Sequence, residues 1–251
     1  MLTIAILTRN NSASIEHLIH GLSWASDILV IDDNSSDATV DLAQKAGARS
    51  IVHELKNDYS SARTLAMDEA KYNWVLFLDA DETLDSDAVA SIKKLNLHTA
   101  KDAGFRISRV DYFWNQRVSH GEVKSAYQTG IIRLINRTQG EWVGKVHERF
   151  IPTGTIGVLP GLIEHRSHKS ISDFIERVNY FSDIRAQELV NQSRIRTMFE
   201  MVLLPPGKFI YTYFVCLGFM DGAAGFVYSF MMSFHSFLVR AKILSRENQS
   251  L

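Results

Sequence analysis

The first hundred residues alternate short apolar runs with segments of helical periodicity. The apolar runs occupy residues 2–7, 27–31, 50–53 and 74–78. Runs this short and this apolar are typical of buried strands in a parallel sheet. Amphipathic helices are expected between them, over about residues 15–22, 37–46 and 60–71. Strands that alternate with such helices form βαβ units, so the sequence predicts an α/β fold with a mostly parallel, Rossmann-like sheet.

Carboxylates follow two of the expected strands. Asp32 and Asp33 come directly after the second apolar run, and Asp79 and Asp81 come directly after the fourth. Because open α/β sheets bind ligands at the carboxyl ends of their strands, we expect both pairs to lie at one edge of the sheet. Two carboxylates one residue apart offer the hard oxygen ligands that suit Mg²⁺ or Mn²⁺ carrying a diphosphate.

Simpler structural interpretations exist for these residues. An isolated Asp-x-Asp is most often an acidic loop that caps the next helix. Asp32 and Asp33 precede Asn34-Ser35-Ser36, which is typical of turns and helix caps. Arg63, near the start of the third helix, either meets a base or a phosphate or lies on a solvated helix face.

Four segments resemble glycosyltransferase family 2, whose members are inverting enzymes of the GT-A fold. The segments are Ile6-Leu7-Thr8-Arg9-Asn10, Val30-Ile31-Asp32-Asp33-Asn34-Ser35-Ser36-Asp37-Ala38-Thr39, Ser61-Ala62-Arg63-Thr64 and Leu78-Asp79-Ala80-Asp81-Glu82. Each is weak alone, but they occur in order and at the family's spacing. One departure is Thr64, which stands where the family usually has Asn. The resemblance implies that Asp33 recognises uracil or another base and that Asp81, with Asp79, binds the metal.

The second half of the chain is expected to supply the acceptor side. Arg133-Leu134, followed by Trp142-x-Gly144-x-Val146-His147-Glu148, resembles the bacterial subgroup that decorates lipopolysaccharide core and related glycans. Inverting transfer needs a carboxylate to take the proton of the acceptor hydroxyl. Glu148 is the first candidate for this base, and Asp111 and Glu122 follow it. The alternative for Glu148 is a surface acid beside a structural His147.

The resemblance also selects further ligands. Many GT-A enzymes take a metal ligand from the region of His165, although a lone His is usually structural. The expected metal ligands are therefore Asp81, Asp79 and His165. The expected donor-binding residues are Thr8, Asn10, Asp32, Asp33, Arg63, Asp79 and His147. The aromatic and polar region 111–128 is suited to line a sugar-binding site, although aromatic residues more often belong to a hydrophobic core.

The C-terminal part changes character. Residues 172–196 have the pattern of an amphipathic helix, and two apolar runs, 209–219 and 225–239, flank Asp221-Gly222. Neither run reaches the ~20 residues of a spanning helix, so we expect a helical hairpin or interfacial pair with a membrane-interface segment at 201–239. Ten Lys and Arg against six Asp and Glu between Arg166 and Arg246 would attract anionic lipid. The alternative is a buried helix pair or a dimer face.

Composition narrows the functional classes. The 251 residues carry 27 Lys and Arg against 28 Asp and Glu, which gives no global attraction to nucleic acid. Cys216 is the only cysteine, so neither a disulfide framework nor a cysteine-based zinc site is expected. The chain opens on a strand-like segment without a basic leader, so we expect no signal peptide.

Together these features predict a GT-A domain over residues 1–170 and a helical tail over residues 171–251. The expected activity is inverting, Mn²⁺- or Mg²⁺-dependent transfer from a nucleotide sugar, preferably UDP-linked, to a glycan or glycolipid. The expected location is peripheral, on the cytoplasmic face of the bacterial inner membrane. Alternatives are a membrane-bound nucleotide-sugar binding or scaffold protein and a nucleotidyltransferase. The sequence leaves the sugar, the acceptor and the oligomeric state open.

Overall fold

The computed structural model describes the chain except residues 57, 146–147, 169, 190–192 and 250–251, and except the side chains of residues 167–168 and 247–249. The described chain divides into two compact units. The first unit comprises Met1–Arg109 and Thr129–His165, and the second comprises Val110–Gln128 and Arg166–Leu251. The second unit therefore includes an internal segment as well as the C-terminal helices.

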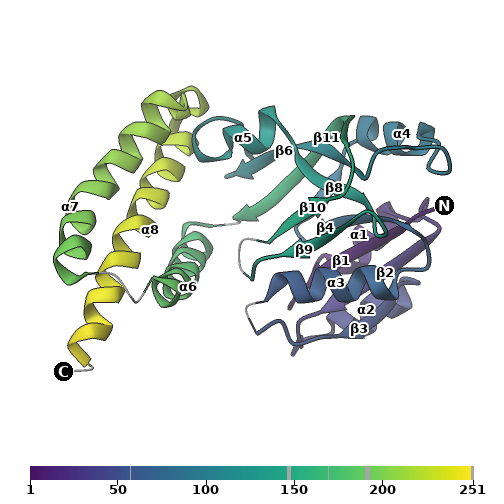
Figure 1. Ribbon diagram of the computed structural model, residues 1–251, viewed down its shortest axis with the longest axis horizontal. Coiled ribbons are helices and arrows are strands. Elements are labelled where there is room, and N and C mark those ends of the chain that lie inside the picture. The colour runs from purple at the N-terminus through teal and green to yellow at the C-terminus, as the bar shows by residue number, and fades with distance from the viewer. Residues whose placement is uncertain (57, 146–147, 169, 190–192, 250–251) are drawn as a thin grey trace. The chain divides into compact units, whose positions relative to one another are not determined.

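The first unit begins with the expected alternation of strands and helices (Figure 1). Its elements are β1 (Thr3–Thr8), α1 (Ile15–Gly21), β2 (Asp27–Asp32), α2 (Thr39–Lys45), β3 (Arg49–Val52), α3 (Tyr59–Glu69) and β4 (Trp74–Asp79). The four strands pair in parallel in the order β3-β2-β1-β4. The predicted α/β fold and the predicted parallel βαβ units are confirmed.

Antiparallel strands extend this sheet beyond β4. The added elements are β5 (Glu82–Leu84), α4 (Ser86–Lys94), β6 (Gly104–Phe113), β8 (Ile131–Asn136) and β11 (Ile156–His168). The full order is β3-β2-β1-β4-β8-β6-β11-β5. A separate antiparallel pair is formed by β9 (Gly140–Val143) and β10 (Arg149–Pro152). The sheet is thus mixed, with the parallel strands at one side.

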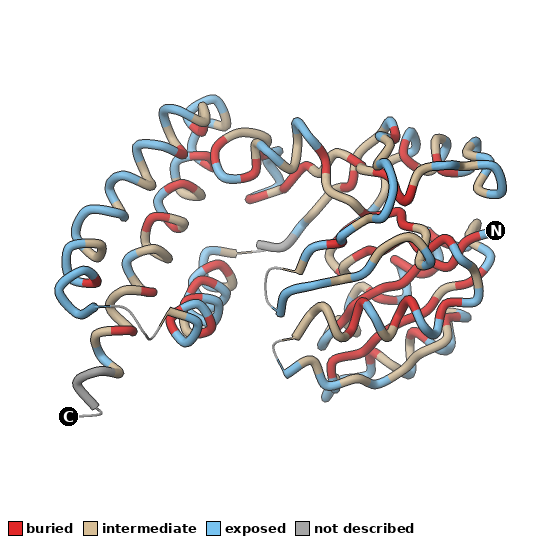
Figure 2. The backbone as a smooth tube through the Cα atoms, viewed as in Figure 1, coloured by how far each residue is buried: buried red, intermediate tan, exposed pale blue. Residues whose placement is uncertain are grey.

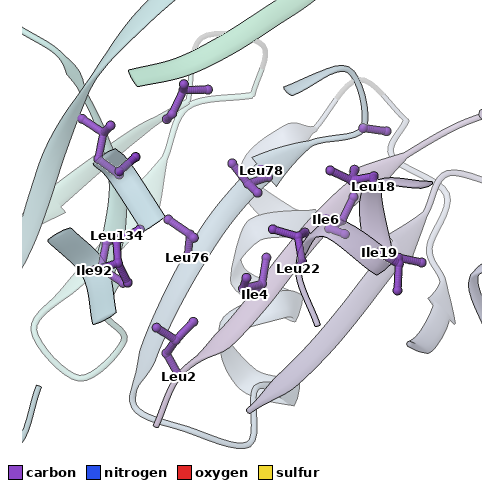
Figure 3. Close-up of a cluster of buried hydrophobic side chains, with 14 of the residues drawn as sticks. Leu2, Ile4, Ile6, Leu18, Ile19, Leu22, Leu76, Leu78, Ile92 and Leu134 are labelled. Carbon is purple, nitrogen blue, oxygen red and sulfur yellow. The ribbon is translucent and has the colours of Figure 1, made fainter. Parts of the chain in front are cut away.

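Both faces of β1 and β4 are buried, as the run of buried backbone in Figure 2 shows. Even-numbered residues of β1 and β4, such as Ile4 and Leu76, join α1 and α4 in one core (Figure 3). Odd-numbered residues, such as Ala5 and Phe77, pack against α3 in a second core. Since side chains alternate along a strand, an uninterrupted apolar run fills both cores. This packing holds the carboxyl ends of β1, β2 and β4 rigid.

Two glycines of the first unit adopt a positive φ for different reasons. Gly47 follows α2 with φ of +96° and terminates that helix, as its position predicts. Gly161 on β11 has φ of +100°, and a Cβ there would lie 2.0 Å from the backbone nitrogen of Ala88 in α4. Only glycine therefore allows β11 to pass the start of α4 this closely.

The second unit consists mainly of helices. Its elements are β7 (Gln116–Val118), the 3₁₀ turn η1 (Gly121–Val123), α5 (Lys124–Gln128), α6 (Ile171–Glu188), α7 (Arg194–Ile210), η2 (Tyr211–Val215), η3 (Gly218–Asp221) and α8 (Gly222–Gln249). Helix α8 packs against both α6 and α7. The core of the unit joins Phe113 and Val118 to Phe174 of α6 and to Ala224 and Met231 of α8.

The tip between α7 and α8 is fixed by hydrogen bonds between Asp221 and the segment 119–120. The Asp221 carboxylate accepts hydrogen bonds from the backbone N–H groups of Ser119 (3.1 Å) and His120 (2.8 Å). Nδ1 of His120 lies 2.8 Å from the other carboxylate oxygen. The side chain of Asp221 is only 5% exposed. The residue that interrupts the apolar sequence is therefore held inside the unit.

A helical hairpin is present, but its first arm is α7, and most of the apolar run 209–219 forms the tip instead of an arm. The expectation that neither apolar run belongs to a helix of spanning length is also wrong. Among the described residues, the stretch Gly218–Arg246 is long and apolar enough to cross a membrane, with a mean hydropathy of 1.3, although a buried core helix would pass the same test. The unbroken apolar run, residues 225–239, is shorter than α8, which contains it. The helix begins earlier and continues past Arg240, because a helix accommodates scattered serines and single charges.

Candidate active site

The carboxyl ends of β1, β2 and β4 form one edge of the sheet. In the parallel register Thr8 lies opposite Asp32, and Leu7 lies opposite Asp79. The two acidic segments therefore lie on either side of β1, as expected for a ligand-binding edge.

Asp32 is committed to its own turn. Its side chain accepts the backbone N–H of Ser35 at 2.8 Å and the Ser35 hydroxyl at 2.5 Å. The backbone N–H of Asn10 donates to that same hydroxyl at 2.8 Å. This is the turn chemistry that the Asn-Ser-Ser sequence indicated, and a role of Asp32 in donor binding stays a prediction.

Asp33 is oriented by two contacts. The backbone N–H of Leu55 donates to Oδ1 at 2.9 Å, and Nη1 of Arg9 donates to Oδ2 at 3.1 Å. The Asp33 side chain is 11% exposed, whereas that of Arg9 is 61% exposed. Movement of Arg9 alone would open Oδ2 to a ligand donor such as the N–H of a base.

Thr8 and Asn10 shape the loop after β1. The Thr8 hydroxyl accepts a hydrogen bond from Nδ2 of Asn11 at 3.2 Å. Asn10 adopts φ of 51°, a left-handed conformation that asparagine tolerates better than most residues. Its Oδ1 accepts the backbone N–H of Ser36 at 2.9 Å. Asn10 thereby ties the loops that follow β1 and β2 to each other.

Asp79 belongs to a mostly buried network of ion pairs with Arg133 and Glu82. Nη2 of Arg133 lies 2.8 Å from Asp79 Oδ2 and 2.6 Å from Glu82 Oε1. The other oxygen of Glu82 accepts the backbone N–H of Asp79 at 3.1 Å. Arg109 Nη1 lies 3.7 Å from Glu82. The side chain of Asp79 is 33% exposed, whereas that of Glu82 is fully buried. Of these two acids, only Asp79 reaches solvent.

The network shifts the pKa values of its members in opposite directions. Burial opposes ionisation of Asp79, but the positive charges of Arg133 and Arg63 lower the pKa of Asp79 well below its usual range. Burial raises the pKa of Glu82 despite the nearby Arg133. The charge of Asp79 is therefore secured by its neighbours.

Arg63 links Asp79 to Glu148. Nε of Arg63 donates to Glu148 Oε1 at 2.9 Å, and Nη2 lies 3.4 Å from Asp79 Oδ1. The guanidinium lies 5.3 Å from the ring centre of Phe77 and 4.9 Å from that of Trp142. The side chain of Arg63 is 5% exposed, so it does not lie on a solvated helix face. Glu148 is 15% exposed, and His147 lies outside the described residues.

Asp81 and His165 approach each other at the same site. Strand β11 runs antiparallel to β5 with His165 opposite Glu82, which brings Nε2 of His165 to 3.5 Å from Oδ1 of Asp81. Both side chains are partly exposed, at 22% and 15% for Asp81 and His165. Within the described part of the chain, no group of three or more His, Cys, Asp or Glu is arranged to hold a metal. The pair fits Mn²⁺ or Mg²⁺ if oxygens of the donor diphosphate complete the coordination shell.

The other two candidate bases belong to the second unit. Asp111 is buried on β6, and Glu122 in η1 pairs with Lys208 at 2.7 Å.

Sequence reasoning missed Arg133, Glu82 and Arg109. The sequence places Arg133 only in an expected strand and in a segment that resembles the family. A signal was present, because a charged residue inside the apolar run Ile131-Ile132-Arg133-Leu134-Ile135 is buried only when it is paired. The sequence does not reveal the partner, which is 54 residues away for Asp79.

Comparisons with known proteins agree with this architecture. The lipopolysaccharide core biosynthesis glycosyltransferase LpsC of Rhizobium meliloti (strain 1021) is 25% identical over 98% of this chain and 92% of its own length. An uncharacterized glycosyltransferase of Rickettsia prowazekii (strain Madrid E) is 27% identical over 98% of this chain and 88% of its own length.

Among solved structures, a mycobacterial protein superposes with a TM-score of 0.50 at 15% identity, covering 74% of each chain. This similarity concerns the fold alone. The sequence profile of glycosyl transferase family 2 matches residues 3–133, which contain β1 to β4, the Asp-x-Asp segment and Arg133. The chain therefore belongs to glycosyl transferase family 2.

Proposed function

We propose that this glycosyltransferase moves a sugar from a UDP-linked donor to a hydroxyl of a glycan or glycolipid, with inversion at the sugar carbon. The observation that carries the proposal is the convergence at one sheet edge of Asp33, the Asp79-x-Asp81 segment and Glu148. These groups match the three tasks of the reaction, which are binding a nucleotide, holding its diphosphate and taking a proton.

The nucleotide binds beside β1 and β2 in this proposal. Asp33 accepts the N–H of the base, and the loops held by Thr8, Asn10 and Asp32 enclose it. Asp33 suits this task because its carboxylate is already oriented by the backbone N–H of Leu55, and because Arg9, which also contacts it, has a side chain that is 61% exposed. A preoriented acceptor loses little conformational freedom when the ligand binds.

Asp81 and His165 hold a divalent metal together with the diphosphate. When bound, the metal supplies positive charge that stabilises the departing nucleotide. The imidazole nitrogen favours Mn²⁺ over Mg²⁺, which prefers oxygen ligands. Asp79 keeps its negative charge beside this site and is held in place by Arg133 and Arg63.

Glu148 acts as the base. Its carboxylate takes the proton of the acceptor hydroxyl as the hydroxyl oxygen attacks the anomeric carbon and the bond to the nucleotide diphosphate breaks. One displacement of this kind inverts the anomeric carbon. Glu148 lies in the loop before β10, where its side chain is 15% exposed and is bound by Arg63.

The acceptor is a lipopolysaccharide-core type of glycan. The support is the similarity to LpsC over 98% of this chain, together with the apolar surface of the second unit. A lipid-linked acceptor requires the enzyme to work next to a membrane.

Membrane contact is assigned to helix α7. Figure 2 shows this helix as mostly exposed. Large apolar residues cover its surface, with exposed fractions of 66% for Phe199, 66% for Val202 and 64% for Leu203. An aromatic cluster at the hairpin tip groups Phe209, Tyr213, Phe214, Phe219 and Phe226. Aromatic residues of this kind are enriched where a bilayer meets water.

The charges within the hairpin support an anionic bilayer as the partner of this surface. Glu200 is paired with Arg196 at 2.7 Å and with Arg240 at 3.4 Å, and Asp221 is paired with His120. Basic residues of the hairpin are paired as well, Lys208 with Glu122 and Lys242 with Asp183. The six Lys and Arg against three Asp and Glu over residues 194–249 nevertheless leave the segment with a net positive charge. Such a surface binds anionic lipid by apolar burial and by charge.

A nucleotidyltransferase is less well supported. That reaction attacks phosphorus and favours a glycine-rich, basic loop after the first strand, whereas this chain has Thr8-Arg9-Asn10-Asn11. A non-catalytic nucleotide-sugar binding protein is tested by hydrolysis of the donor, which an enzyme would show and which would depend on Glu148.

A donor screen tests the proposal directly. Thermal unfolding is measured with Mn²⁺ and a panel of nucleotide sugars. A donor that binds only the native state stabilises it by about 2.7 kcal/mol at one hundred times its Kd. Stabilisation by UDP-sugars, and its loss when Mn²⁺ is chelated, is the expected result. No stabilisation by any nucleotide sugar would contradict the proposed function.

A further inference from the structure

We propose that Arg63 is a positioning residue that holds Glu148 and Asp79 at a fixed separation, rather than a residue that contacts the donor. This inference rests on the proposed function, in which Glu148 is the base. It changes the role that the sequence indicated for Arg63, which was contact with a base or a phosphate.

The hydrogen bonds of Arg63 carry this inference. Nε and Nη2 lie on the same edge of a guanidinium, the edge that commonly grips a single carboxylate with two parallel bonds. In this protein the edge is shared, because Nε donates to Glu148 at 2.9 Å and Nη2 faces Asp79 at 3.4 Å. One rigid plane therefore sets the spacing of two carboxylates that come from distant parts of the chain.

The packing around Arg63 fixes that plane. Its guanidinium is placed over the rings of Phe77 and Trp142 at 5.3 Å and 4.9 Å. Phe77 comes from β4 and Trp142 from β9, and the two rings contact each other edge to face at 5.4 Å. The aromatic faces attract the cation and restrict its tilt. With 5% exposure, the side chain has little surface left for a donor to touch.

The contacts of residue 63 with two carboxylates and two aromatic rings also explain why arginine, and not lysine, occupies this position. Its planar group offers two donors at a fixed angle and stacks on aromatic rings, whereas lysine is a compact point charge on a flexible stem. A lysine at position 63 would keep the positive charge. It would lose the geometry that ties Glu148 to Asp79. Catalysis is sensitive to such a loss, because displacement of a reacting group by about 1 Å costs on the order of a hundredfold in rate.

The test is a double-mutant cycle on the full chain with Arg63→Lys and Glu148→Gln. UDP with Mn²⁺ is the binding probe, measured by calorimetry, and UDP-glucose with Mn²⁺ is the turnover probe, measured by release of UDP. Arg63→Lys is expected to lower kcat by about tenfold to a hundredfold and to leave the Kd of UDP within about twofold. In the Glu148→Gln background, Arg63→Lys is expected to change kcat by less than about threefold, because residues that act as one unit are not additive.

A matched control is Arg49→Lys. Arg49 also grips a buried carboxylate, with Nη2 at 2.8 Å from Asp27, but Asp27 lies at the amino end of β2, away from the proposed site. Arg49→Lys should lower the melting temperature and leave kcat unchanged. A fall in kcat for both variants in proportion to lost stability would show that Arg63 acts only through the fold, and would overturn the proposal.

Other outcomes separate the positioning role from the base assignment. A weaker affinity of Arg63→Lys for UDP, which needs no turnover to detect, would restore the donor-contact role and overturn the positioning role. Additive losses in the double mutant would show that Arg63 acts independently of Glu148, with the same consequence. Normal turnover of Glu148→Gln would remove the base assignment itself and, with it, the proposed function of that residue.

Discussion

The acidic side chains at the carboxyl edge of the sheet differ in the partners that they contact within the protein. Asp32 accepts a hydrogen bond within its own turn, and Asp79 pairs with Arg133. Asp81 is partly exposed and lies 3.5 Å from His165. Asp33 and Asp81 are the acids to which the proposed function gives the most direct contacts with the donor and its metal. Substitutions at these positions give the clearest tests at the scale of single residues.

Asp81→Asn is expected to abolish the part of UDP affinity that depends on Mn²⁺ while the fold persists. Loss of the charge removes a hard metal ligand, and an amide at a partly exposed position costs little stability. Calorimetry with and without Mn²⁺ measures the effect. Asp87→Asn, in the exposed first turn of α4, is the control. Wild-type affinity in Asp81→Asn would rule out the metal assignment.

Asp33→Asn is expected to weaken UDP and the complete nucleotide sugar alike, by roughly tenfold to a hundredfold, because the lost bond is to the base. Asparagine keeps an oxygen for the backbone N–H of Leu55, so the local structure should survive. Binding of both ligands is compared by calorimetry. Selective weakening of the nucleotide sugar would instead place the sugar at Asp33.

At the scale of elements, β1 to β4 and their helices could be predicted because short, uninterrupted apolar runs alternate with segments of helical period. Helix α6 ends at Glu188, earlier than its sequence pattern suggested, and the β9–β10 pair was not anticipated. Within the site, the edge that unites Asp32 and Asp79 followed from parallel pairing. The partners Arg133 and Glu82 did not, since long-range ion pairing has no sequence period.

The approach of β11 to α4 predicts a large effect of one methyl group. Gly161→Ala should lower the free energy of unfolding by at least about 2 kcal/mol, through a positive φ and a backbone clash at 2.0 Å. Gly47→Ala is the matched control. It has a similar φ of +96° with open space around it, so it should cost only about 1–2 kcal/mol. Chemical denaturation measures both, and equal losses would contradict the clash.

The pairing of Asp27 with Arg49 at the opposite edge gives a pH-dependent prediction. Burial alone would raise the pKa of Asp27, but the hydrogen bonds from Arg49 and Thr3 lower it below its usual value. A carboxyl with a lowered folded pKa adds stability above its unfolded pKa of about 3.9, and this stability is lost as the pH falls through the folded value.

Asp27→Asn should therefore lower the free energy of unfolding by about 1.5–3 kcal/mol at neutral pH. The difference from the wild type should shrink as the pH falls below roughly 4. Urea unfolding of both proteins across this range measures it. A difference that is constant down to strong acid would show that Asp27 contributes through packing rather than through charge.

At the scale of the whole molecule, the exposed surface of α7 predicts association with anionic vesicles. Full-length protein should float with them and lose affinity as salt is added, because salt screens the basic residues. Replacing both Phe199 and Leu203 with Glu should reduce the floating fraction by more than about tenfold, since each buried apolar side chain contributes about 1.5–3 kcal/mol.

Val158→Glu is the control for that experiment, because Val158 is 71% exposed on β11 in the first unit. Point substitutions are preferable to removing the chain after Arg196. Truncation would delete Ala224 and Met231 and uncover the core that they share with Phe113 and Phe174. If wild type and variants stay equally soluble and none floats, α7 covers another protein surface, and the glycolipid acceptor loses its main physical support.

The hydrogen bonds between Asp221 and residues 119–120 limit how the α7–α8 hairpin could be grafted onto another protein. A graft of residues 194–249 onto another domain would carry the helices but leave behind the two N–H groups and the imidazole that the Asp221 carboxylate binds. That carboxylate would then face solvent or lipid at the tip of an apolar hairpin. The portable module is therefore discontinuous in sequence, and any chimera that retains the tip must also inherit the segment between β7 and α5.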